Sequence, residues 1–256
     1  MRKKNQKKLF YIANWKMNFS LNDEIYFSGT NRDSFIKLSL EHDIILCPSY
    51  LGLYPINKLF NNSSVQLGAQ DCSKHLKGSF TSQISVISLS EVDCKYCIIG
   101  HSEVRKEEKQ TDKDIALKAD LLVKNQISPI ICIGEPKKTK KLDKVVDILK
   151  CQLKHVFDII EKNLNIFVGK SIFIAYEPIW AIGSGKIPKL EDLEKIFDWL
   201  FLNSKKKYSE INFKLIYGGS VDSSNVIDFK KIPNLDGFLI GGASLDFQEF
   251  EKIVKL

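Results

Sequence analysis

The carboxylate of Glu177 is the group whose surroundings most clearly indicate chemistry in this sequence. It follows the apolar, β-type run 171–176 (Ser-Ile-Phe-Ile-Ala-Tyr). A partly desolvated carboxylate at a strand end is suited to act as a general base. The next segment, 178–186, opens with stiff and bulky residues and carries Gly183 and Gly185 as hinge-like positions, which predicts a lid that closes over a substrate and excludes water. A salt-bridging glutamate at a helix N-terminus is the structural alternative.

Three other polar residues also stand at the ends of apolar runs. Asn14 and Lys16 end the run 9–15, and His101 follows Cys-Ile-Ile-Gly. Histidine changes charge near neutral pH and is a candidate acid or base, although a lone histidine is as often structural. Lys16 needs a charged partner for its ammonium group. An anionic ligand would supply one, a pair with Glu103 is the alternative, and the two are compatible.

Two glycine pairs, at 218–219 and 241–242, follow the last two apolar runs, and Ser220 adds a hydroxyl group to the first. Backbone N–H groups exposed in such turns ahead of a helix bind phosphate. Glycine pairs also serve tight turns that bind nothing. Their position after the last two runs favours a phosphate site.

Apolar β-type runs and amphipathic helical patterns alternate along the whole chain. The runs cover residues 9–15, 44–48, 65–70, 96–100, 129–134, 172–176, 214–217 and 237–240. The helical patterns include 111–124, 145–161, 190–202 and 245–254. Near-continuous apolar runs are typical of parallel strands buried on both faces, and eight βα units in about 250 residues are the dimensions of a (β/α)8 barrel.

We therefore expect an α/β fold with one domain, a (β/α)8 barrel over residues 1–256, in which residues 1–8 form a basic N-terminal arm. An open doubly wound sheet would usually carry a G-x-G-x-x-G turn after the first strand, and the sequence has none there. The C-terminal strand ends of a barrel form one mouth. We expect the four polar residues and the glycine turns to meet at this mouth.

The charge of the chain is +7 and is carried largely by lysine, with runs at 2–8 and 137–141. Such runs can bind nucleic acid, but a solvated lysine-rich surface is favoured, and no nucleic-acid partner is predicted. The modest positive electrostatic field of the chain would also favour a phosphorylated, anionic substrate. No run approaches the length of a membrane helix, and no secretory signal precedes Leu9.

The six cysteines are scattered, and several lie inside apolar runs, which indicates reduced thiols in a cytosol-like compartment. Cys94 and Cys97 have the spacing of a metal or redox half-site. No second Cys/His pair accompanies them, so we expect a structural role and no metal site. A cytoplasmic address is predicted, and an organellar form whose transit peptide has been removed also fits the sequence.

Five motifs contain the polar residues and glycine turns described above. They are residues 14–18 (Asn-Trp-Lys-Met-Asn), 100–103 (Gly-His-Ser-Glu), 176–183 (Tyr-Glu-Pro-Ile-Trp-Ala-Ile-Gly), 217–220 (Tyr-Gly-Gly-Ser) and 241–245 (Gly-Gly-Ala-Ser-Leu). Together, and in this order, they resemble the triosephosphate isomerase family, and the resemblance extends from about residue 10 to residue 256. Residues 67–71 and 132–135 are also similar to the family. The resemblance implies a TIM barrel.

The resemblance also implies an activity, the interconversion of dihydroxyacetone phosphate and D-glyceraldehyde 3-phosphate through an enediolate, in glycolysis and gluconeogenesis. Glu177 would move the proton between carbons, and His101, as neutral imidazole, would polarise the carbonyl. Lys16 and Asn14 would stabilise the developing oxyanion. The implied protein is a homodimer that needs no metal or organic cofactor, because carboxylate and imidazole suffice. The implied substrate-binding residues are Asn14, Lys16, Gly183, Ser220, Gly241 and Gly242.

The sequence departs from the family at a protruding loop of the dimer interface. Ser82 and Gln83 stand where the family usually has Gly-Glu, and Val104 stands where it has arginine. The two charged partners of an ion pair that the family forms across the interface are thus both absent, which is milder than the loss of one. We expect the dimer to persist, with a weaker dimer or a monomer as the alternative. Thr81 remains at the loop tip, and Gln110 replaces a common glutamate.

Two other functions remain to be weighed. A catalytically silent homologue would retain phosphate binding alone, but the intact Glu177, His101, Lys16 and Asn14 argue against it. Another phosphosugar enzyme on the same fold, such as an aldolase or epimerase, would carry a Schiff-base lysine late in a strand or a His/Asp metal cluster. Neither is visible in the sequence.

Overall fold

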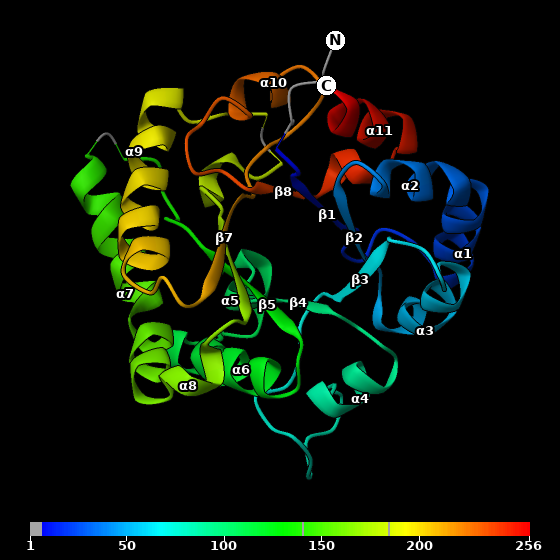
Figure 1. The fold of residues 1–256 in the computed structure, drawn as a ribbon, viewed down its shortest axis with the longest axis horizontal. Helices are drawn as coiled ribbons and strands as arrows, with labels where there is room; N and C mark the ends of the chain where they lie inside the picture. Colours follow the sequence, from blue (N-terminus) through cyan, green and yellow to red (C-terminus); the bar gives the residue numbers. More distant parts are fainter. Residues whose placement is uncertain (1–6, 140, 184) are drawn as a thin grey trace.

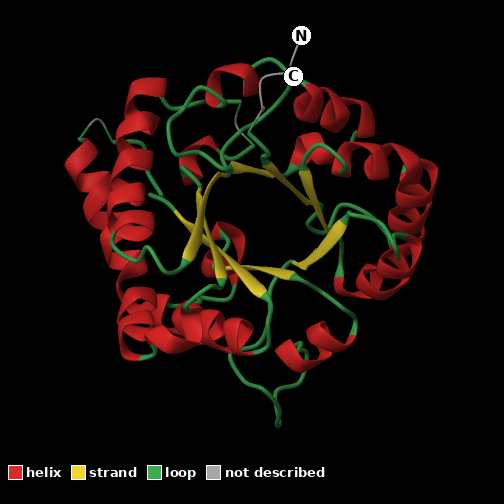
Figure 2. Ribbon diagram, viewed as in Figure 1, coloured by secondary structure: helices red, strands yellow, loops and turns green. Residues whose placement is uncertain are grey.

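The structure, a computed structural model, describes residues 7–139, 141–183 and 185–256. Within them, eight parallel strands form a closed barrel in sequence order, with β1 pairing both β2 and β8 (Figures 1 and 2). The strands are β1 (Phe10–Asn14), β2 (Asp43–Cys47), β3 (Gln66–Ala69), β4 (Tyr96–Ile99), β5 (Ser128–Ile133), β6 (Ser171–Tyr176), β7 (Asn212–Tyr217) and β8 (Gly237–Ile240). The predicted single-domain (β/α)8 TIM barrel is confirmed.

Helices surround the barrel on all sides (Figure 2). They are α1 (Leu21–Thr30), α2 (Arg32–Ser39), α3 (Tyr50–Leu59), α4 (Val86–Glu91), α5 (Ser102–Glu107), α6 (Asp112–Lys124), α7 (Leu142–Lys162), α8 (Leu164–Phe167), α9 (Leu190–Phe201), α10 (Val226–Phe229) and α11 (Phe247–Lys255), with the shorter turns η1 (Ile179–Ala181), η2 (Leu202–Lys206) and η3 (Gly242–Ser244). The predicted helical patterns correspond to α6, α7, α9 and α11.

The helix boundaries follow local capping chemistry. Thr111 caps α6 in a reciprocal pair with Asp114, in which each side chain accepts the backbone N–H of the other residue. Helix α11 begins two residues later than predicted, because the carboxylate of Asp246 accepts the backbone N–H groups of Gln248 and Glu249.

The core consists of two shells separated by the barrel wall. Successive residues of a strand point to opposite faces, so Ile12 joins the barrel interior while Tyr11 and Ala13 pack against the helices. The N-terminal end of the interior is filled by aromatic rings, including Phe10 and Phe173 at 4.9 Å in an edge-to-face arrangement. Burial on both faces explains why the strands read as continuous apolar runs.

Five of the six cysteines are buried free thiols, as expected for a structural role, and the sixth is on the surface. Cys94 and Cys97 are buried, and the Cys94 thiol donates to the carbonyl of Tyr96 at 3.0 Å, whereas Cys151 on α7 is exposed. None of the described residues form a group of His, Cys, Asp or Glu suited to hold a metal ion.

The basic N-terminal arm is described only at its end, because residues 1–6 lie outside the described part of the chain. There, Lys7 pairs with Asp236 at 3.1 Å and Lys8 with Asp43 at 2.9 Å. No helix in the described ranges is long and apolar enough to cross a membrane.

Candidate active site

A pocket of about 270 Å³ opens at the C-terminal ends of the strands. Every site residue that the sequence predicts lines it. These are Asn14, Lys16, His101, Glu177, Gly183, Ser220, Gly241 and Gly242. Asn14 is the last residue of β1, and the others come from the segments that follow β1, β4, β6, β7 and β8. The barrel thus brings together one carboxylate, one imidazole, one ammonium group and several glycine turns.

Glu177 continues β6 into the mouth and is buried to 2% exposure. Its backbone N–H donates to the carbonyl of Ile133 at 2.7 Å, which ties it to the end of β5. Burial raises the pKa of the Glu177 carboxyl, and His101 and the Cys132 thiol oppose that shift. A base with such a raised pKa binds a proton more readily than an exposed glutamate does, as proton abstraction requires. Gly218 makes room for the Glu177 side chain, because a Cβ at position 218 would lie only 2.8 Å from Cγ of Glu177.

His101 stands at the start of α5 as its N-cap. Its Nδ1 accepts the backbone N–H of Glu103 at 3.3 Å, which assigns the ring proton of the neutral imidazole to Nε2. Nε2 in turn faces Oε1 of Glu177 at 3.5 Å. The imidazole therefore presents an N–H donor to the pocket beside the candidate base.

Lys16 reaches the pocket through an unusual backbone conformation, with φ of 54°. Its N–H donates to Oδ1 of Asn14 at 3.2 Å, and its carbonyl accepts Nε2 of Gln70 at 2.8 Å. A left-handed conformation at a residue other than glycine costs about 1–3 kcal/mol and persists where the surroundings fix it. Here the polar groups of Asn14 and Gln70 do so. Sequence reasoning missed this role of Gln70.

The ammonium group of Lys16 has the charged partner that the sequence offered as one alternative. Nζ pairs with Oε1 of Glu103 at 2.6 Å. It also lies beside the second glycine turn, since a Cβ on Gly241 would be 3.9 Å from it. The pair with Glu103 therefore leaves the ammonium group next to the turn for which the sequence predicts phosphate binding.

Two charged residues that the sequence did not single out support the strand ends. Arg105 donates to the carbonyls of Gly100 at 2.7 Å and Cys132 at 3.2 Å, and pairs with Asp112 at 2.6 Å. The guanidinium thus joins the end of β4, next to His101 in the chain, to β5 and α6. The five fixed donors of an arginine suit such a junction.

The second support is Glu135, which is buried after β5 and holds the start of the predicted lid. Its carboxylate accepts Nε1 of Trp180 at 2.5 Å and the hydroxyl of Tyr176 at 3.0 Å. Burial raises the pKa of Glu135, and the two donors oppose that shift. Lys138 lies over the Trp180 ring at 4.7 Å. Glu135 directly follows the apolar run 129–134, and this position was the signal that could have identified it from the sequence.

The far part of the predicted lid carries its hinge glycines. Gly183 has φ of 62° and Gly185 has φ of 68°, a region that favours glycine. Ser184, between them, lies outside the described residues. The segment from Pro178 to Gly183 thus contains Trp180, which Glu135 holds near its start, and ends at a glycine with positive φ.

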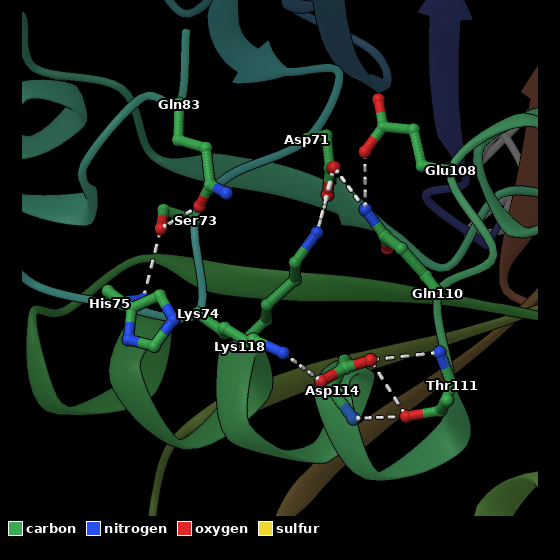
Figure 3. A network of polar contacts seen from close by, with 10 residues as sticks. All are labelled: Asp71, Ser73, Lys74, His75, Gln83, Glu108, Gln110, Thr111, Asp114 and Lys118. Atoms are coloured by element: carbon green, nitrogen blue, oxygen red, sulfur yellow. Dashed lines mark hydrogen bonds and ion pairs between the residues drawn. The ribbon is translucent and has the colours of Figure 1, made fainter. Parts of the chain in front are cut away.

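The loop between β3 and α4 projects from the rim of the barrel (Figure 1) and includes Gln83. Oε1 of Gln83 accepts the hydroxyl of Ser73 at 2.5 Å, within the same loop (Figure 3). His75 stacks on Phe80 at 3.8 Å between ring centroids. These contacts give the projecting loop its own internal support.

Gln110 lies in a polar network next to this loop (Figure 3). Its Nε2 donates to Asp71 at 2.9 Å and to Glu108 at 3.1 Å. The same carboxylate of Asp71 receives Nζ of the buried Lys118 at 2.8 Å. Because residue 110 is a glutamine and not a glutamate, it places a neutral N–H donor between the carboxylates of Asp71 and Glu108.

Comparison with known proteins gives a single answer. The family model described as triosephosphate isomerase matches residues 9–256. The triosephosphate isomerase of Aquifex aeolicus is 34% identical over 94% of this chain and 96% of its own length. The enzyme of the same name from Wolbachia pipientis wMel is 35% identical over 95% and 92% of the two chains, and that of Buchnera aphidicola subsp. Cinara cedri 36% over 96% of both. The chain therefore belongs to the triosephosphate isomerase family, and its enzyme class is that of a triose-phosphate isomerase of glycolysis.

Proposed function

We propose that Glu177 and His101 carry out the isomerisation by acid–base proton transfer, and that the reaction serves gluconeogenesis as well as glycolysis. The single observation that carries this proposal is the pairing of a buried carboxylate with an imidazole N–H at 3.5 Å in the barrel mouth. Glu177 removes a proton from one substrate carbon and returns it to the neighbouring carbon. His101 donates the Nε2 proton to the carbonyl oxygen on which negative charge develops and takes up the proton of the neighbouring hydroxyl, so that carbonyl and hydroxyl exchange places and the imidazole is neutral again.

Lys16 and the phosphate turns hold the anionic substrate. The Lys16 ammonium stabilises the enediolate oxygen, and Asn14 supports the backbone from which Lys16 extends. Gly183, Ser220 and the pair 241–242 bind the phosphate group through backbone N–H groups and one hydroxyl. Carboxylate, imidazole and ammonium supply every proton and charge that a 1,2-proton shift requires, so the proposal invokes no cofactor.

The carboxylate of Glu177 must move during the cycle. Its Oε1 lies 3.5 Å from Nε2 of His101, which leaves no room for a substrate carbon between the two atoms. Because Glu177 directly precedes the lid, closure of residues 178–186 can carry the carboxylate over the substrate and exclude water.

We also propose that the protein is a cytoplasmic homodimer. The supported projecting loop, with Thr81 at its exposed tip, is shaped to reach a second copy. Met17, next to Lys16, is 95% exposed, as are many side chains of an interface when its partner is absent. Sedimentation at low micromolar concentration tests this proposal, and a single monomer species would overturn it.

The decisive experiment for the reaction is isomerase turnover with D-glyceraldehyde 3-phosphate. We expect the native protein to be active, and Glu177→Asp and Glu177→Gln each to lose activity by about 10²–10⁴-fold, while both still bind a phosphate analogue. Absence of turnover in the native protein despite analogue binding would instead favour a silent homologue.

A further inference from the structure

A second pocket, of about 360 Å³, lies at the opposite end of the barrel from the candidate active site. Its lining comes from segments that enter three neighbouring strands. Leu9 precedes β1, His42 precedes β2, and residues 230–235 precede β8. Substrate chemistry at the mouth makes no use of this end.

Lys230 brings an uncompensated positive charge to this pocket. The side chain is half-buried, and burial lowers the pKa of its ammonium group. Within the described residues no carboxylate oxygen lies within 4.0 Å of Nζ, and residues 1–6 contain no acidic side chain. Nζ instead lies 5.4 Å from the centre of the Tyr11 ring. The adjacent Lys231, by contrast, pairs with Asp228 at 2.6 Å.

His42 supplies a directed donor in the same pocket. The residue is only 8% exposed, and its ring packs edge-to-face on Tyr11 at 5.2 Å. Nδ1 accepts the backbone N–H of Leu9 at 3.4 Å, which assigns the proton of the neutral ring to Nε2. In the described part of the chain, Nε2 has no hydrogen-bond partner, although the ring lines the pocket.

The acidic groups around this pocket already have partners or face solvent. Asp236 pairs with Lys205 and with Lys7, the latter at 3.1 Å. Asp43 pairs with Lys8 at 2.9 Å, and Glu41 is exposed. Among the described residues, the pocket therefore combines an ammonium group that has no carboxylate partner with the N–H donor of His42, and the paired Lys7 also lines it.

We propose that this pocket binds a small phosphate-bearing anion, inorganic phosphate or a phosphomonoester, between Nζ of Lys230 and Nε2–H of His42. Charge-assisted hydrogen bonds to phosphate are the strong class of hydrogen bond. The pocket is assembled from the segments that precede β1, β2 and β8, so it exists only in the folded chain. Binding of the anion therefore stabilises the folded state by mass action. The proposal is independent of the isomerase mechanism.

The chain contains only four histidines, so the imidazole signals in an NMR spectrum can be followed one by one. We expect inorganic phosphate to shift the signal of His42 with its own saturation curve, separate from that of His101 in the active site. Occupying the mouth first with a triose-phosphate analogue, at a concentration that saturates the His101 signal but leaves the His42 signal unshifted, should leave the His42 curve for inorganic phosphate in place. Sodium chloride at matched ionic strength is the control, because general screening would move His42 in both salts.

Variants of the adjacent Lys230 and Lys231 distinguish binding at this pocket from a general effect of the net charge of the protein. Lys230→Met should weaken the His42 response about tenfold, Lys230→Arg should retain most of it, and Lys231→Met should leave it unchanged. Thermal unfolding without phosphate shows whether each variant is folded. An His42 signal that stays constant while His101 shifts, an equal response to chloride, or an equal effect of Lys230→Met and Lys231→Met would overturn the proposal.

Discussion

Oε1 of Glu177 and Nε2 of His101 lie 3.5 Å apart across the mouth of the barrel, at the ends of β6 and β4. The carboxylate is held in a buried position where its pKa is raised, and the imidazole is held by the first turn of α5. The environment of each group therefore depends on the other, and both are accessible to perturbation by mutation and by pH.

We predict that kcat/KM falls as the pH is lowered through the raised pKa of Glu177, at a higher pH than for an ordinary glutamate. The reason is that burial favours the protonated carboxyl, which cannot act as a base. The profile of kcat/KM against pH measures this. Glu177→Asp is the comparison, because an acid limb that comes from the substrate phosphate stays in place in that variant, whereas a limb that comes from the enzyme moves.

We predict that Glu177→Gln stabilises the protein at pH 8 although it inactivates the enzyme. In the folded chain the pKa of Glu177 is raised, so the ionised carboxylate costs free energy of folding at neutral and alkaline pH. This cost disappears as the pH falls below the ordinary value. Thermal unfolding at pH 8 and pH 4 should show a gain at pH 8 alone. An equal gain at both values would contradict a charge effect.

We predict that His101→Asn lowers kcat about 10²–10⁴-fold with little change in stability. Asparagine retains a side chain able to cap α5 but cannot exchange protons. His101→Ala should lose the same activity and, in addition, about 1 kcal/mol of stability, because the N–H of Glu103 loses its acceptor. Steady-state kinetics and urea unfolding separate the two effects. Equal stability of the two variants would exclude the capping role.

We predict that Trp180→Phe destabilises the protein by about 1–3 kcal/mol, because the buried carboxylate of Glu135 loses a hydrogen-bond donor. Tyr176 remains as its other donor. A double-mutant cycle with Glu135→Gln, followed by urea unfolding, measures the coupling between the two side chains. Additive effects would mean that the indole does not stabilise the carboxylate.

We predict that Ser82→Gly stabilises the projecting loop by up to about 1 kcal/mol. Ser82 has φ of 73°, where an L-residue is strained and glycine is not, although glycine loses more entropy on folding. Ser79→Gly in the same loop is the control, since Ser79 lacks a positive φ and should gain nothing. Urea unfolding monitors both variants, and an equal change in the two would exclude relief of backbone strain at Ser82.

We predict that Gln110→Glu destabilises the protein at pH 7.5, because it places a third carboxylate beside Asp71 and Glu108. Lys118 is already bound to Asp71. The loss should shrink at pH 5, where the added carboxyl is more readily protonated. Gln110→Leu removes the donor without adding charge and should lack this pH dependence. A pH-independent loss in both variants would assign the effect to the missing hydrogen bond.

Sequence by itself determined the fold and the identity of the groups in the mouth. Apolar runs buried on both faces mark parallel strands, and polar residues that directly follow such runs must lie at the strand ends. Closure of the barrel then places Asn14, Lys16, His101 and Glu177 in one pocket. The strand bounds were predicted to within two residues, because local patterning sets them.

Only the tertiary structure decided which partners hold these groups. Gln70 contacts Lys16 from the loop after β3, Arg105 on α5 contacts the carbonyl of Cys132 in β5, and Glu135 after β5 binds Trp180 after β6. Such pairings depend on the register between strands and on side-chain direction, which no local pattern contains. The same holds for Lys230, which has no carboxylate partner among the described residues, because the presence or absence of a partner is a property of the assembled fold.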